Sequence, residues 1–244
     1  MVEERTDEEQ IEALKAWWDE NGTKTLAVLV LIIGGYFGWE TWSNKIQAHS
    51  QQASDLWQET FDIVEGKSAR EVEVDQMVLV GSNIDKLKQD YADTAYSHFA
   101  ASLRAKLSVE MGDLDTAADA LQWSLENNFD EATQIVTRLR LARVEAARGN
   151  FELALEMVQG VDAGQHNAAY DEAKGDFYIQ LGESDAAYTA YESAMAASQS
   201  ADTTTQNVLA LKISQVAPAS VPTDGGDQID PAAESDAVMV ETGE

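Results

Sequence analysis

The sequence predicts an all-α protein in which a single N-terminal transmembrane helix is followed by an α-solenoid of helical hairpins. Three observations lead to this fold class. Residues 26–39 carry no charge, the chain after them follows helical apolar spacing, and three later segments repeat one pattern around a glycine. The predicted segments are residues 1–22, 23–42, 43–94, 95–216 and 217–244.

The predicted membrane anchor is residues 23–42. The charge-free run alone is short, because about 20 apolar residues are needed to span a bilayer. Extending the helix from Gly22 to Trp42 gives about 31 Å, which is long enough. Four tryptophans flank the run where an interfacial aromatic belt would lie, and they are Trp17, Trp18, Trp39 and Trp42.

Residues 1–22 form an acidic arm. Thr6 to Glu9 reads as a capping box that opens a helix, and Asn21-Gly22 is expected to close it. The arm lacks the basic leader and cleavage site of a signal peptide, so the anchor is expected to stay attached. Lys15 and Lys24 precede the span and Lys45 follows it, which favours a cytoplasmic N-terminus.

Within the anchor, Gly34 and Gly38 form a G-x-x-x-G pattern. Small residues at this spacing allow the backbone of another transmembrane helix to approach closely. Because glycine is common in membrane helices, a composition effect is the alternative to a helix–helix contact.

Residues 43–94 are expected to form a helical stalk and an N-terminal cap. No glycine or proline interrupts residues 40–64, so the anchor helix is expected to continue out of the membrane. After a break at Gly66, residues 69–91 again follow helical spacing, with Gly81 inside the stripe. The sequence leaves open whether residues 66–91 belong to the repeat stack or form a separate cap.

The repeats are centred on Gly112, Gly149 and Gly182, at intervals of 37 and 33 residues. A glycine permits a tight turn between two helices. Seven residues before each glycine stands a small residue, and nine after it a larger apolar one that is expected to pack across the pair. In chain order, these pairs are Ala105 with Leu121, Ala142 with Val158, and Gly175 with Tyr191.

Over residues 95–199 this pattern resembles the tetratricopeptide repeat family, in which antiparallel helix pairs stack into a curved solenoid. With the arm sequence from Gln10 to Gly22 and the segment from Tyr91 to Tyr96, residues 8–216 resemble the YfgM family, ancillary subunits of the bacterial SecYEG translocon. The resemblance implies a single-pass inner-membrane protein with its repeats in the periplasm. It also implies two partners, the Sec translocon and the membrane-anchored periplasmic chaperone PpiD.

The end of the repeat region is predicted to be a cap helix at residues 203–216, with Val208, Leu211 and Gln215 in line. Residues 217–244 carry three prolines, seven carboxylates and no basic residue. That composition cannot bury a core, so a disordered tail is expected.

Charge and composition exclude several functions. The formal charge of −28, from 44 acidic and 16 basic residues, argues against a nucleic-acid partner. The acidity serves either solubility in salt or recognition, and composition does not separate the two. Cysteine is absent, and His49, His98 and His166 lack metal-ligand spacing. We therefore expect no enzymatic activity and no cofactor.

In a tetratricopeptide-like array the first helix of each hairpin lines the concave groove. The glycine register then gives ten candidate groove residues, which are Phe99, Ser102, Lys106, Val109, Val136, Leu139, Arg143, Glu172, Asp176 and Ile179. Lys106 and Arg143 occupy equivalent positions and suggest a small basic patch. The alternative is that both are solvated or pair with neighbouring carboxylates.

These features predict a non-enzymatic, membrane-anchored periplasmic module that binds proteins. The resemblance implies association with the Sec translocon and a chaperone, with unfolded secreted proteins as further partners. The alternative is a periplasmic scaffold for envelope or cell-division complexes without Sec contact.

Overall fold

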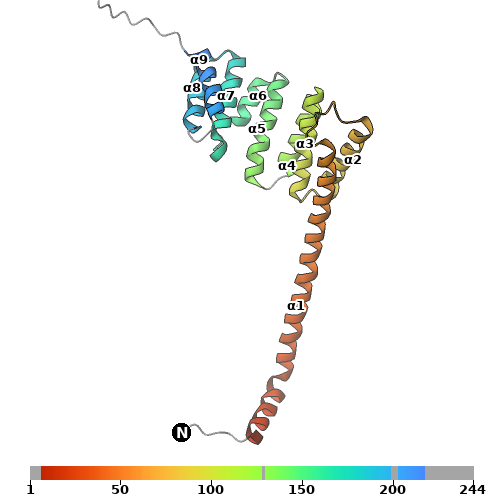
Figure 1. Ribbon diagram of the computed structural model, residues 1–244. Coiled ribbons are helices and arrows are strands. Elements are labelled where there is room, and N and C mark those ends of the chain that lie inside the picture. Colours follow the sequence, from red (N-terminus) through yellow and green to blue (C-terminus); the bar gives the residue numbers. More distant parts are fainter. Residues whose placement is uncertain (1–6, 128–129, 199–202, 218–244) are drawn as a thin grey trace, which may run out of the picture.

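The computed structural model describes residues 7–127, 130–198 and 203–217. In these ranges the chain is helical and contains no strand, so the predicted all-α class is confirmed. The helices, drawn in Figure 1, are α1 Asp7–Val64, α2 Val74–Asp90, α3 Ala95–Met111, α4 Leu114–Asn127, α5 Glu131–Ala147, α6 Phe151–Val158, the 3₁₀ turn η1 Gly164–His166, α7 Asn167–Leu181, α8 Ser184–Ala197 and α9 Thr203–Val216.

Helix α1 has 58 residues, which corresponds to about 87 Å. The predicted helix end at Asn21-Gly22 is wrong, because α1 passes through it without a break. One glycine costs a helix interior only about 1 kcal/mol, and the Trp18 ring covers Gly22, 3.1 Å from where its Cβ would lie. The predicted capping residue Thr6 lies outside the described residues.

Among the described helices, α1 alone is long and apolar enough to cross a membrane. Figure 1 shows its N-terminal part projecting away from all the other helices. Its apolar side chains are therefore uncovered, with exposed fractions from 46% at Leu29 to 74% at Leu31 in the charge-free run. A surface this apolar is unfavourable in water and favourable in lipid.

The far end of α1 forms a hairpin with α2, and α3 packs against both. One core cluster joins Ala53 of α1, Ile84 and Leu87 of α2, and Leu103 of α3. The stack of helices therefore begins with the end of the stalk. The predicted start of a helix at residue 69 is wrong: α2 begins at Val74, while Gly81 does not interrupt it.

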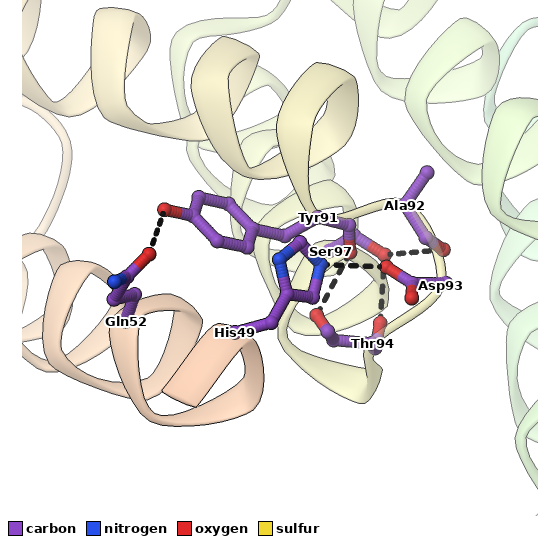
Figure 2. A network of polar contacts seen from close by, with 7 residues as sticks. All are labelled: His49, Gln52, Tyr91, Ala92, Asp93, Thr94 and Ser97. Atoms are coloured by element: carbon purple, nitrogen blue, oxygen red, sulfur yellow. Dashed lines mark hydrogen bonds and ion pairs between the residues drawn. The ribbon is translucent and has the colours of Figure 1, made fainter. Parts of the chain in front are cut away.

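A polar network fastens α1 to the turn between α2 and α3 (Figure 2). His49 Nε2 lies 3.0 Å from Asp93 Oδ1, and the His49 and Tyr91 ring centroids are 4.8 Å apart. The Tyr91 hydroxyl donates to Gln52 Oε1 at 3.4 Å. The Thr94 carbonyl accepts a 2.8 Å bond from the Ser97 hydroxyl, which closes the turn. These contacts hold the turn between α2 and α3 against α1.

Three helical hairpins follow, namely α3–α4, α5–α6 and α7–α8. At each turn the predicted glycine is left-handed, with φ of 82° at Gly112, 89° at Gly149 and 79° at Gly182. The N–H of the following residue donates back to a carbonyl of the first helix, on Ser108, Glu145 and Tyr178. This is the Schellman geometry, in which a non-glycine residue at the left-handed position would be strained.

The predicted pairs of small and large residues pack across these hairpins. Ala105 shares a core cluster with Leu121, and Ala142 shares one with Val158. Gly175 is the tightest case, since a Cβ there would lie 2.3 Å from Cε1 of Tyr191. The predicted hairpin packing is therefore confirmed.

Helix α9 has the predicted bounds, but its predicted packing face is wrong. Val208 and Leu211 are 44% and 60% exposed, and Leu209 is buried at 1%. Lys212, three residues after Leu209, donates to Glu172 and Asp176 of α7 at 2.7 Å. Helix α9 therefore packs through the face that carries both Leu209 and Lys212. Of the predicted tail, residues 218–244 lie outside the described residues.

Candidate functional site

A cavity of about 900 Å³ lies between the end of α1, α3 and α5. Two helix stripes face each other across it. Helix α3 contributes residues 99, 102, 106 and 109, and α5 contributes residues 136, 140 and 143. Steps of three and four residues keep each set on one helix face.

The wall formed by α1 and α3 is aromatic. The Trp57 ring lies 5.5 Å from Phe61 and 5.8 Å from Phe99, measured between centroids. Phe61 remains 39% exposed and Phe99 45% exposed. Exposed aromatic area of this kind, in a hollow bounded by polar residues, is typical of a surface that contacts another protein.

The wall formed by α5 carries two arginines, Arg140 and Arg143, and Lys106 belongs to the facing helix α3. Three cations and one carboxylate, Glu110, line the cavity, in a chain whose formal charge is −28. Arg140 Nη1 donates to the neutral Ser102 hydroxyl at 3.3 Å. Lys106 Nζ lies 3.4 Å from Glu110 Oε1. Arg143 lines the cavity and forms no ion pair with any described residue.

Glu110 is itself held by the loop before α2. Its Oε2 accepts a 2.6 Å hydrogen bond from the backbone N–H of Ala69. One oxygen is thus occupied by the backbone and the other faces Lys106. Lys106 therefore has a carboxylate partner, whereas Arg140 and Arg143 have none among the described residues.

Two histidines lie at the cavity with different roles. His98 is 7% exposed, and its Nδ1 lies 3.1 Å from the Ser124 hydroxyl. Burial lowers the pKa of His98, so its imidazole is neutral near pH 7. His166 is half-buried and lines the cavity near the end of η1.

Six of the ten candidate groove residues line this cavity, and they are Phe99, Ser102, Lys106, Val109, Val136 and Arg143. The other four lie elsewhere. Leu139 is packed in the core with α6 and α7. Glu172 and Asp176 accept from Lys212 of α9, and the half-buried Ile179 is not part of the lining. The cavity therefore covers a shorter stretch of the repeats than the glycine register implied.

Sequence reasoning did not place Trp57, Phe61, Arg140 and His166 at this site. Arg140 had a local signal, since it stands four residues after Val136 and three before Arg143. Trp57 and Phe61 had none, because their position depends on the packing of α1 against α3.

Gly34 and Gly38 lie on the exposed surface of α1, where a Cβ would meet no atom within 4 Å. They make no close approach to another described helix, so their role in helix packing stays a prediction. Within the described ranges, no three His, Asp or Glu side chains come together as a metal site.

The fold and the cavity define a helical-repeat protein carried on a long apolar helix. A family model described as a tetratricopeptide repeat-like domain matches residues 15–218. Curated relatives named ancillary SecYEG translocon subunit match 75–77% of this chain. The relative from Aggregatibacter actinomycetemcomitans is 30% identical over 189 residues, covering 77% of this chain and 88% of the relative.

The relative from Haemophilus influenzae is 29% identical, with the same coverage. The relative from Escherichia coli is 27% identical over 75% of this chain and 84% of the relative. The chain therefore belongs to the family of ancillary SecYEG translocon subunits.

Proposed function

We propose that this protein is a non-enzymatic binding module of the bacterial inner membrane that associates with the Sec translocon. Its N-terminus is cytoplasmic and its repeats are periplasmic. The supporting observation is the continuity of α1: one helix carries the uncovered apolar surface and also supplies Trp57 and Phe61 to the cavity. The partner is proposed from the name of the relatives, ancillary SecYEG translocon subunit.

The spacing of the aromatic pairs supports a transmembrane position for α1. From Trp18 to Trp39 is about 32 Å along the helix, close to the hydrocarbon thickness of a bilayer. Trp17 and Trp18 lie together at one end, with centroids 6.5 Å apart, and Trp39 and Trp42 at the other, 5.4 Å apart. Both pairs are then at the interfaces, where tryptophan is favoured.

The same helix sets the height of the cavity. Trp57 and Phe61 are about 22–28 Å along α1 from Trp42. Between Trp42 and Trp57, the contact of His49 with Asp93 fastens the turn between α2 and α3 to α1. The cavity would therefore stand at a fixed distance from the membrane. We propose that it holds segments of other proteins there, either unfolded secreted chains or a membrane-anchored periplasmic chaperone of the PpiD type.

Site-specific photocrosslinking from Phe37 or Trp39 tests the association. We expect adducts with a membrane helix of the Sec complex or with the chaperone. The control position is Val78, which is 68% exposed on α2 and outside the lipid-facing run. Adducts only with envelope or division proteins at the anchor positions would replace this proposal with the scaffold alternative.

An alkaline phosphatase fusion tests the orientation. A fusion after Val216 should be active, because the enzyme folds only when exported. Inactivity of this fusion would invert the proposed topology.

A further inference from the structure

We infer that the cavity selects extended segments of other proteins in which apolar residues alternate with carboxylates. This inference rests on the proposed function and names the class of segment that the site takes. The inference is based on the different character of the two cavity walls. The wall formed by α1 and α3 is aromatic, and the wall formed by α5 carries two arginines in a strongly acidic chain.

The two walls match the geometry of an extended chain. Side chains of an extended segment point alternately to opposite sides. A segment lying between α3 and α5 can therefore place one set against Phe61 and Phe99 and the other against Arg140 and Arg143. The two arginines are about 4.5 Å apart along the axis of α5, so their flexible side chains can meet carboxylates two residues apart, at about 6.6 Å.

The arginines are available for such contacts. Arg143 has no ion pair among the described residues, and Arg140 donates to the neutral hydroxyl of Ser102. A guanidinium binds a carboxylate through two parallel hydrogen bonds, which gives direction as well as attraction. By contrast, the exposed Arg148 already has a carboxylate partner in Asp115.

The overall charge sharpens the expected selectivity. A field from −28 charges attracts basic segments to the surface at long range and repels acidic ones. Binding that is nevertheless tighter for an acidic segment must arise from local contacts. The preference should therefore depend on the two arginines and increase when added salt screens the field of the whole protein.

A second possible occupant is the chain's own C-terminal segment, which has seven carboxylates and no basic residue. It includes Val238, Met239 and Val240 between Asp236 and Glu241. We favour a segment of another protein, because the matched family region ends at residue 218 while the cavity lies wholly within it. The test includes a variant that lacks residues 218–244.

The test measures fluorescence anisotropy of a labelled peptide, Gly-Leu-Glu-Phe-Asp-Val-Glu-Leu-Gly, with the full chain in nanodiscs of zwitterionic lipid. Three matched peptides replace the acidic residues with Gln, the acidic residues with Lys, or the apolar residues with Ser. At about 0.15 M salt we expect the acidic peptide to bind about tenfold tighter than the Gln peptide, and the Lys and Ser peptides more weakly still.

The protein variants locate the contact. Arg140→Gln combined with Arg143→Gln should remove the preference for the acidic peptide over the Gln peptide. The matched control is Arg138→Gln, on the same helix but not part of the cavity lining, and it should leave both affinities unchanged. Far-UV circular dichroism of each variant checks that the helices are retained.

The outcomes separate the two levels of the argument. Equal affinity for the acidic and Gln peptides overturns the inference about carboxylates and leaves the proposed function intact. Absence of binding by every peptide, with or without residues 218–244, contradicts a protein-binding role for the cavity. Binding seen only after those residues are removed identifies the chain's own segment as the occupant and also overturns the inference.

Discussion

The contact between Gly175 of α7 and Tyr191 of α8 provides a sharp test of how the hairpins are held together. A Cβ at position 175 would lie 2.3 Å from Tyr191 Cε1 and 2.5 Å from Cδ1, far inside the contact distance of two carbon atoms. The ring cannot move freely, because its hydroxyl donates to Asp176 at 2.8 Å and Lys212 lies 5.5 Å from its centroid. Gly175→Ala must therefore separate the two helices or break the Tyr191 hydrogen bond.

The expected magnitude is a difference between two opposing effects. Overpacking costs typically 1–3 kcal/mol, and a contact of 2.3 Å belongs in the upper part of that range, about 2–3 kcal/mol. The higher helix propensity of alanine returns about 1 kcal/mol. We expect Gly175→Ala to lower the free energy of unfolding by about 1–2 kcal/mol and the Tm by about 2–8 °C. The control is Gly81→Ala in α2, where a Cβ would meet no atom within 4 Å, so stability should stay the same or increase by up to about 1 kcal/mol.

The assay is urea unfolding of the full chain in detergent, followed by near-UV circular dichroism. A double variant, Gly175→Ala with Tyr191→Leu, copies the natural pair of Ala105 and Leu121. It should lose about 1–2 kcal/mol less than the sum of the two single changes. Strict additivity, or a Gly175→Ala protein as stable as the parent, would refute the argument that this close approach determines the hairpin.

Two further predictions concern ionisable groups. Burial alone would lower the pKa of Lys212, but its hydrogen bonds to Asp176 and Glu172 outweigh burial and raise it. The stabilisation is therefore complete below the unfolded pKa of about 10.4 and is lost as pH rises through the folded value. Lys212→Met should cost about 1–2 kcal/mol near pH 7, a low value because Asp176 is 43% exposed, and should abolish that alkaline loss in urea titrations. For His98, whose pKa burial lowers, the unfolded chain binds the proton more readily, so stability should fall below about pH 6.5. His98→Gln, which can keep a bond to Ser124, should flatten the difference in urea midpoint between about pH 5.5 and about pH 7.5; an unchanged difference would contradict this assignment.

The sequence by itself determined the local features of the fold. The charge-free run identified the apolar helix because many adjacent apolar residues are unfavourable in contact with water and must be covered by protein or lipid. The left-handed turns at Gly112, Gly149 and Gly182 could be placed because a positive φ favours glycine strongly. The pairs of small and large residues could be predicted from their distance to each glycine, because helix periodicity determines which residues before and after the turn face each other.

Only the tertiary structure decided where the cavity begins and ends. At one end, Trp57 and Phe61 join the lining because α1 packs against α3, some forty residues further along the chain. At the other, α9 packs against α8, and its Lys212 engages Glu172 and Asp176 of α7 in ion pairs. Both limits depend on contacts between distant segments, and periodicity within one helix carries no information about which of its faces such a contact will select.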